Sequence, residues 1–238
     1  MTKVPKYWDK AKKYLSKKDR TMYKLIKSYQ SPSEIILTSR RDVFFSLCKS
    51  IIGQQISVAA ANSVFLKFKK KCNGKINAKI VSKLSSSKLK SCGLSRQKVL
   101  GIKSLSKVTL NKSFNPKLIN KMSDEEAIIY LSKLRQIGRW SAEMILLFTY
   151  NRSNIWPVQD IGLLRAISKN YKKKISTSRK VCKFIEKKVF TLLLSSYMVS
   201  LEKYRSRAYS VLNPSITCIC LTVVSLAKSQ PAWYSFES

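Results

Sequence analysis

Apolar residues recur at helical spacing along most of the chain, and no long series of alternating apolar and polar residues is present. The periodicity predicts helices over residues 42–52, from about Ser57 to Lys70, and across 75–100 with short turns. Residues 1–30 form an amphipathic helical segment that Ser31-Pro32-Ser33 ends. The pattern therefore predicts an all-α fold.

Two helical patterns flank a short turn in the middle of the chain. The first begins at Ser123, where Glu126 three residues later completes the capping-box pattern that satisfies free N–H groups. After the turn Arg135-Gln136-Ile137-Gly138-Arg139, a second helix is predicted from Trp140 to Phe148. We expect Gly138 to adopt the positive φ that so sharp a turn needs.

The helix that follows this turn offers a site for an anion. The N–H groups of a first helical turn lack intrahelical partners, and the positive end of the helix dipole lies there. This arrangement suits a phosphate group. An ordinary helix pair without a ligand is the alternative interpretation.

The charge, the absence of histidine and the spacing of the cysteines limit the kinds of function that the chain can have. Forty-seven Lys and Arg residues against twelve Asp and Glu residues give a net charge of +35, which favours nucleic acid as the partner. The chain has no histidine, so serine–histidine catalysis and histidine metal sites are excluded. The six cysteines form neither paired Cys-x-x-Cys ligands nor a four-cysteine iron–sulfur run. We therefore expect no metal and no cofactor.

Membrane attachment is not predicted. The N-terminus is basic and lacks an apolar signal core. The apolar run Ile216–Ala227 is too short to span a bilayer, and no polybasic amphipathic anchor stands out. We expect a cytoplasmic monomer, associated with the nucleoid in a bacterium.

Two segments carry a resemblance to a known family. IGRWSAEM (137–144) is followed by WPVQDIGLL (156–164), which places Asp160 sixteen residues after Met144. Upstream, residues 50–57 read SIIGQQIS. Over residues 35–188 the chain resembles the helix-hairpin-helix DNA glycosylases, specifically the 3-methyladenine DNA glycosylase II group. It departs from that pattern at Gln136, where the family usually has the first hairpin glycine.

The resemblance implies an all-α, two-lobed helix-hairpin-helix glycosylase fold and a specific reaction. The enzyme would flip an alkylated purine nucleotide out of duplex DNA and hydrolyse its N-glycosidic bond. Asp160 would be the catalytic carboxylate that stabilises positive charge on the deoxyribose. Alternatively, Asp160 is an ordinary helix N-cap, and the two roles can coexist.

The same resemblance implies a base pocket and a DNA-binding surface. The aromatic or soft pocket walls would come from Trp140, Met144 and Trp156, although core packing is the favoured interpretation for Met144. The Gln54-Gln55 turn would probe the minor groove and fill the gap left by the flipped nucleotide, with a merely solvated turn as the alternative. The hairpin residues implied to bind DNA are Gln136, Ile137, Gly138, Arg139 and Ser141.

The position after the hairpin separates two reaction types. Related bifunctional enzymes carry a Schiff-base lysine where this chain has Trp140, so the resemblance implies a monofunctional enzyme that uses water. A glycosylase/lyase of the same superfamily and a non-catalytic helix-hairpin-helix DNA-binding protein remain as alternatives. The expected partner is double-stranded DNA that contains alkylated bases.

The resemblance also suggests an organisation of the chain. Residues 102–120, rich in Lys, Ser and Asn, are predicted to connect an N-terminal helical lobe (1–115) to a hairpin lobe with the catalytic aspartate (116–188). The segment Gly93–Lys98 resembles the family's G-x-S-x-x-K segment, which we interpret as a helix start capped by Ser95.

Residues 189–238 do not continue the resemblance. The family's ending resembles YCSVATWYLWR, whereas this chain has VFTLLLSSYMVSLEKYRS. Codons for Met198–Lys203 read one base later can yield WYLWRS, and codons for Leu192–Tyr197 can yield YCSVAT. We therefore interpret this tail as frame-shifted, with a genuine divergent tail as the alternative. Sequencing the gene around codons 185–205 distinguishes the two.

Overall fold

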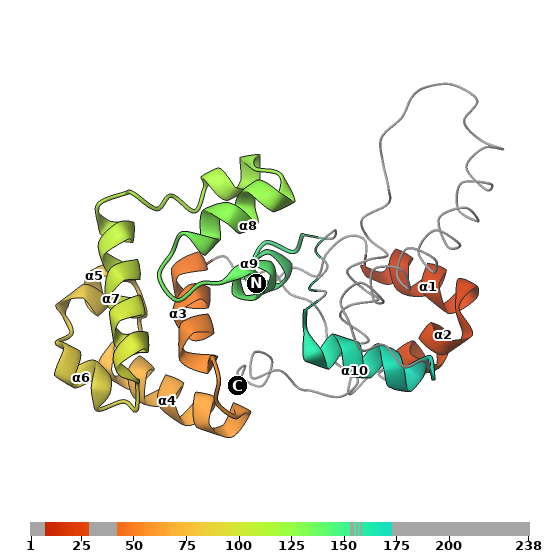
Figure 1. The fold of residues 1–238 in the computed structure, drawn as a ribbon, viewed down its shortest axis with the longest axis horizontal. Coiled ribbons are helices and arrows are strands. Elements are labelled where there is room, and N and C mark those ends of the chain that lie inside the picture. Colours follow the sequence, from red (N-terminus) through yellow and green to blue (C-terminus); the bar gives the residue numbers. More distant parts are fainter. Residues whose placement is uncertain (1–7, 29–41, 153–154, 156, 158, 173–238) are drawn as a thin grey trace. The chain divides into compact units, whose positions relative to one another are not determined.

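A computed structural model describes residues 8–28, 42–152, 155, 157 and 159–172 (Figure 1). Every regular element within these residues is a helix, which confirms the all-α prediction. The described helices fall into two compact units, one holding α3 to α9 and the other holding α1, α2 and α10. The tail of residues 189–238 and Trp156 lie outside the described residues.

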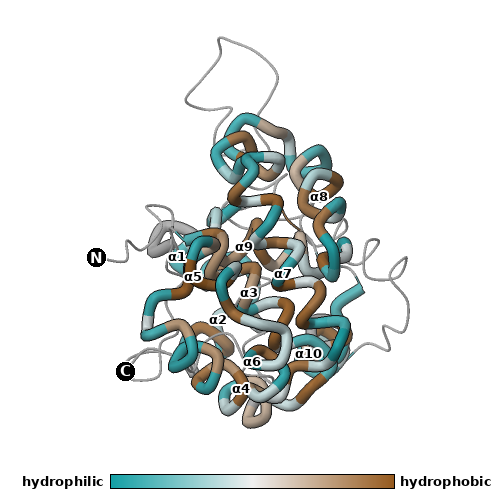
Figure 2. Tube along the Cα trace, turned by 90° about the vertical axis from the view of Figure 1, so that its left-hand side faces the viewer, coloured by the Kyte–Doolittle hydropathy of each residue, from teal (hydrophilic) through white to brown (hydrophobic). Residues whose placement is uncertain are grey.

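The first unit is built around α3. This helix lies between α7 and α9 and is buried along its length, with Leu47, Cys48 and Ile51 all 0% exposed (Figure 1). Its apolar stretches and those of α9 gather in the middle of the unit, whereas polar stretches line the outer turns (Figure 2). The elements are α3 (Val43–Gly53), α4 (Val58–Lys71), α5 (Ala78–Lys83), α6 (Ser86–Lys90), α7 (Arg96–Leu110), the 3-10 helix η1 (Leu118–Lys121), α8 (Asp124–Ser132) and α9 (Arg139–Phe148).

Polar caps explain why these helices begin where they do. In each of α3 to α8 the residue before the helix accepts a hydrogen bond through its side chain from a backbone N–H three residues later. Such caps satisfy donors that have no intrahelical partner. Ser95 caps α7, and Ser123 with Glu126 forms a full capping box, so both sequence-based cap predictions are confirmed.

The predicted connection over residues 102–120 is wrong in its first half. Helix α7 continues to Leu110, and its residues Ile102 and Leu105 are 0% and 2% exposed. Its hydroxyl residues do not break it, because Ser106 donates to the Ile102 carbonyl and Thr109 to the Leu105 carbonyl. The helices on either side of residue 115, α7 and α8, both lie in the first compact unit.

The second unit contains α1 (Trp8–Lys18), α2 (Arg20–Ser28) and α10 (Ile161–Asn170). The single helical segment predicted for residues 1–30 is interrupted at Asp19, whose Oδ1 accepts hydrogen bonds from the N–H groups of Thr21 and Met22 at 2.8 and 3.0 Å. The other carboxylate oxygen accepts from the Tyr171 hydroxyl at 3.2 Å, just beyond α10. Asp19 therefore starts α2 and ties it to the end of α10.

Replacing this cap should weaken the second unit. Asp19→Ala removes the acceptor for two backbone N–H groups, and we expect a loss of about 1–2 kcal/mol in the free energy of unfolding. Tyr171→Phe removes only the hydroxyl and should cost less. Urea denaturation of the wild type and both variants measures the difference. Equal losses in the two variants would show that the bond from Tyr171, and not the cap, is what Asp19 contributes.

Candidate functional site

The turn between α8 and α9 has a different backbone from the one the sequence predicts. Gly138 lies at φ −89°, ψ 178°, which is extended, so the expectation of a positive φ there is wrong. Gln136 carries the positive φ instead, at 69°. Ile137, 4% exposed, anchors the turn in the core, and its N–H donates to the Leu134 carbonyl at 3.0 Å.

A glycine on a neighbouring helix accommodates Gln136. A Cβ placed on Gly101 of α7 would lie 2.8 Å from Gln136 Cγ and 3.1 Å from Gln136 Cβ. Those distances are closer than ordinary van der Waals contact, so the Gln136 side chain occupies the space that a larger residue at position 101 would fill. Gln136 stands where the family usually has a glycine, and the glycine at position 101 leaves room for the Gln136 side chain.

The N-terminus of α9 is open. Gly138 is exposed and provides no side-chain cap, unlike the residues before α3 to α8. A Cβ placed on Gly138 would meet no atom of the described residues within 4 Å. Gly138 therefore leaves the first backbone N–H groups of this ten-residue helix without a side-chain cap, and the anion site expected there from the sequence stays a prediction.

Arg139 joins the first turns of α8 and α9. Its guanidinium donates to both carboxylate oxygens of Glu125, at 2.7 and 2.8 Å, and to Glu143 Oε1 at 3.2 Å. The hydrogen bond from Arg139 lowers the pKa of Glu125, and the same bond raises the pKa of Arg139. The Glu143 side chain is buried, 6% exposed, so this arginine also neutralises a carboxylate in the core.

The structure brings three of the predicted site residues together across long stretches of sequence. Gln54 Nε2 donates to the Gln136 carbonyl oxygen at 2.7 Å and lies 3.3 Å from Ser141 Oγ. Gln54 thus links the α3–α4 turn to the hairpin, and Ser141 is buried beneath it. The next residue, Gln55, is exposed and has a φ of 59°. The two glutamines therefore differ: Gln54 bonds within the protein, and Gln55 projects to solvent.

Sequence reasoning missed the contact that holds this turn. Lys98 Nζ donates to the carbonyl oxygens of Ile52 and Gln54, both at 2.8 Å. Burial lowers the pKa of the Lys98 amino group. The resemblance of residues 93–98 to a family segment predicted a helix start capped by Ser95, but it predicted no role for Lys98. Nothing in the local pattern indicates that the lysine reaches the end of α3.

The predicted pocket and catalytic residues fall into both units. In the first unit, Trp140 is half-buried and Met144 is 7% exposed. In the second unit, Asp160 is half-buried and directly precedes α10, and its N–H donates to the Pro157 carbonyl at 2.9 Å. That turn delivers a carboxylate to the positive end of a helix dipole, where negative charge is stabilised.

The three described cysteines, Cys48, Cys72 and Cys92, are buried free thiols. Burial raises the pKa of each of them, and the pKa of Cys72 reaches about 11. Thiols in this state are protonated and inert near neutral pH. They therefore contribute packing, and none is a candidate nucleophile.

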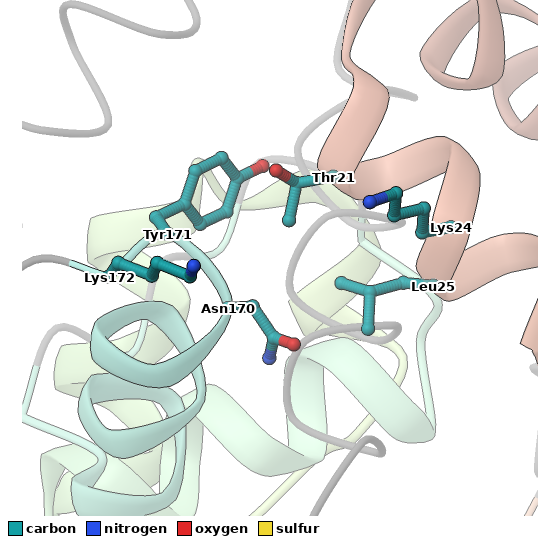
Figure 3. Close-up of a pocket in the computed structure, with 6 residues that line it drawn as sticks. All are labelled: Thr21, Lys24, Leu25, Asn170, Tyr171 and Lys172. Atoms are coloured by element: carbon teal, nitrogen blue, oxygen red, sulfur yellow. The ribbon is translucent and has the colours of Figure 1, made fainter.

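A cavity of about 570 Å³ lies in the second unit, between side chains of α2 and of the end of α10 (Figure 3). None of the predicted site residues that the structure describes lines it. Its walls are Thr21, Lys24, Leu25, Asn170, Tyr171 and Lys172. Among the described residues, no group of His, Cys, Asp and Glu side chains is arranged to hold a metal ion. Nor is any helix there long and apolar enough to cross a membrane.

The hairpin, the uncapped α9 and the motif residues lie within a region that a known family matches. A family model described as "HhH-GPD superfamily base excision DNA repair protein" matches residues 48–190. The chain belongs to this superfamily. The match includes α3 from Cys48 onward, the hairpin and Asp160, and it ends close to residue 188, where the resemblance seen in the sequence stops.

Individual HhH-GPD relatives agree with this assignment. The chain is 27% identical over 157 residues to DNA-3-methyladenine glycosylase 1 of Schizosaccharomyces pombe, covering 65% of this chain and 69% of that one. It is 31% identical over 160 residues to the alkylbase DNA glycosidase-like protein mag2 of the same organism, covering 66% and 75%. The solved structure of the fission-yeast 3-methyladenine glycosylase Mag1 with abasic DNA superposes with a TM-score of 0.66 at 25% identity. That superposition covers 84% of this chain and 100% of the other.

Proposed function

We propose that this protein is a monofunctional DNA glycosylase of the 3-methyladenine type. It would bind duplex DNA as a monomer, flip out an alkylated purine nucleotide and hydrolyse the N-glycosidic bond. The observation that carries the proposal is the match to the fission-yeast enzyme in complex with abasic DNA, which extends over the whole of that chain. Abasic DNA is the product of base excision, and we expect the protein to act in the compartment that contains the cell's DNA.

The hairpin and the first turn of α9 are the proposed phosphate contact. Gly138 is exposed and provides no side-chain cap for α9, and among the described residues no atom lies within 4 Å of a Cβ placed on it. Backbone N–H groups at a helix N-terminus bind phosphate without reading sequence, which suits a repair enzyme that must search all DNA. The net charge of +35 adds long-range attraction to the same partner.

Gln55 is the proposed residue that enters the duplex. It is exposed in the turn between α3 and α4, and its backbone has a positive φ of 59°. An amide side chain can donate to and accept from the base left unpaired by flipping. Gln54 supports it from within the protein through its bonds to the hairpin.

Asp160 is the proposed catalytic carboxylate. Departure of the base leaves positive charge on the deoxyribose, and a half-buried carboxylate stabilises that charge and can orient the attacking water. An alkylated purine is already cationic, so it leaves without a strong general acid. Trp140, Met144 and Trp156 are proposed to contact the flipped base, with cation–π attraction from the tryptophans.

Trp140 is the reason to propose hydrolysis without strand cleavage. An indole cannot form the Schiff base that a lyase requires, because that intermediate needs an amine nucleophile. Trp140 follows the hairpin directly at the second position of α9. Water then takes the place of the amine, and the product is an intact strand with an abasic site.

Incubation with methylated duplex DNA tests the proposal. We expect release of free 3-methyladenine and strands that break only after alkali, while unmethylated duplex releases no base. Affinity for undamaged duplex should fall with salt, with a slope of about −0.9 in log K per phosphate contacted. Strand cleavage without alkali would replace the proposal with a glycosylase/lyase. Salt-dependent binding without any base release would leave a non-catalytic DNA-binding protein.

A further inference from the structure

One face of the first half of α7 contacts both turns that the proposed function places against DNA. Gln97 Oε1 accepts from Arg135 of the hairpin at 3.2 Å, and Gly101 accommodates Gln136. Between them, Lys98 donates to two carbonyls at the end of α3. This face of α7 therefore contacts the hairpin and the α3–α4 turn, and Lys98 makes the contact with the turn.

The chemistry of the Lys98 contact is that of a helix C-cap supplied from a distance. The last carbonyls of a helix have no intrahelical donor, and a cation there also complements the negative end of the dipole. Charge-assisted hydrogen bonds of this kind are roughly twice as strong as neutral ones. The two acceptors, Ile52 and Gln54, lie on either side of Gly53, so the contact fixes the direction in which the chain leaves α3.

That direction determines where Gln55 points. Gln54 is extended, with φ −61° and ψ 134°, and Gln55 follows at φ 59°. The Gln54 side chain bonds to the hairpin while its carbonyl oxygen bonds to Lys98. The separation between the phosphate-binding hairpin and the Gln55 side chain is therefore set by residues inside the protein.

We propose that Lys98 is a positioning residue for base flipping, which holds the Gln54-Gln55 turn so that Gln55 enters the duplex in register with the hairpin. This inference rests on the proposed function and deepens it. Lys98 touches neither DNA nor the reacting atoms in this role. It acts through the backbone of the turn, and its loss should impair recognition of a flipped or missing base more than attachment to undamaged duplex.

The chain offers a matched control on the same helix. Lys103 Nζ donates to the carbonyl oxygens of Ser82 and Leu84, at 3.1 and 2.5 Å, and so caps α5 in the way that Lys98 caps α3. Helix α5 carries none of the proposed DNA-binding or catalytic residues. A contribution to stability alone would therefore be shared by both lysines, and a contribution to positioning would belong to Lys98.

The experiment compares Lys98→Met with Lys103→Met, since methionine keeps an unbranched side chain and removes the donors. Melting temperature, affinity for undamaged duplex, affinity for abasic-site duplex and single-turnover excision are measured for each. We expect similar losses of stability but a roughly tenfold loss of abasic discrimination only in Lys98→Met, the size of one charged hydrogen bond. Lys98→Arg should retain more of the preference for abasic duplex than Lys98→Met does, because a guanidinium can still donate to both carbonyls.

A Gln55→Ala background separates positioning from stability. If Lys98 acts through Gln55, then Lys98→Met added to Gln55→Ala causes little further loss of discrimination, because the two changes remove the same step. Additive losses, or equal losses in Lys98→Met and Lys103→Met, would overturn the inference. If Lys98→Met does not fold, the same comparisons are made with Lys98→Gln, whose side chain is shorter than that of lysine and carries no charge. Unaltered discrimination in Lys98→Gln also overturns the inference.

The abasic-site measurement keeps this inference separate from the proposed function. A wild-type protein that prefers abasic duplex but releases no base would contradict the glycosylase proposal and still report on Lys98. A wild-type protein that releases 3-methyladenine while Lys98→Met discriminates as well as wild type would leave the glycosylase intact and refute the role of Lys98.

Discussion

Asp160→Asn is expected to lose base excision by a factor of about 10²–10³ or more while the protein remains folded. The substitution is nearly isosteric and keeps a side-chain oxygen at the start of α10, where asparagine caps a helix about as well as aspartate. It removes the negative charge proposed to face the developing sugar cation. Single-turnover release of 3-methyladenine from methylated duplex measures the loss.

Binding and stability serve as controls for this variant. Affinity for abasic-site duplex should persist, because the proposed phosphate contacts come from the hairpin and the net charge of +35 is almost unchanged. The free energy of unfolding should fall by only about 0.3–1 kcal/mol, the size of one charge–dipole interaction, so the melting temperature should fall only slightly. Gln159→Ala, at the exposed neighbouring position, should leave excision unchanged. Excision at the wild-type rate in Asp160→Asn would reduce Asp160 to a helix cap.

The features that the sequence predicts well are those set by neighbours in the chain. Ser95 and Ser123 were identifiable as caps because a cap and the N–H group it satisfies lie three residues apart. The burial of α3 followed from apolar residues at helical spacing. The motif around Gly138 was identifiable because it is contiguous, and the family match includes it.

The features that the sequence does not predict depend on contacts between distant segments. Lys98 reaches carbonyls 44 and 46 residues away, and Gln54 reaches the hairpin 82 residues away. Arg139 looks like a phosphate ligand in sequence, yet it pairs with Glu125 fourteen residues earlier. The polar composition after residue 102 predicted a linker. The prediction failed because the hydroxyl groups of Ser106 and Thr109 donate to carbonyls of their own helix, so α7 continues through them.

The contact between the hairpin residue Gln136 and Gly101 of α7 is another feature that depends on distant segments. Gly101→Ala should destabilise the protein by about 1–3 kcal/mol, the usual range for added atoms in a packed site. The new methyl group would lie 2.8 Å from Gln136 Cγ and 3.1 Å from Gln136 Cβ. Rotating the Gln136 side chain moves Cγ but not Cβ. The backbone is held as well, because the Gln136 carbonyl accepts from Gln54 at 2.7 Å.

Gln136→Gly should reverse the sign of that effect. It removes both clashing atoms and keeps the carbonyl that Gln54 binds, and glycine adopts a φ of 69° without the cost that an L-residue incurs. In the Gln136→Gly background, Gly101→Ala should stabilise the protein by about 0.5–1 kcal/mol, because alanine is favoured over glycine in a helix interior. Urea denaturation of the wild type, both single variants and the double variant gives the coupling free energy. A loss of the same size in both backgrounds would mean that Gly101 is needed for another contact, such as the Arg135 carbonyl oxygen 3.5 Å from the added methyl group, and that the Gln136 side chain is free to move.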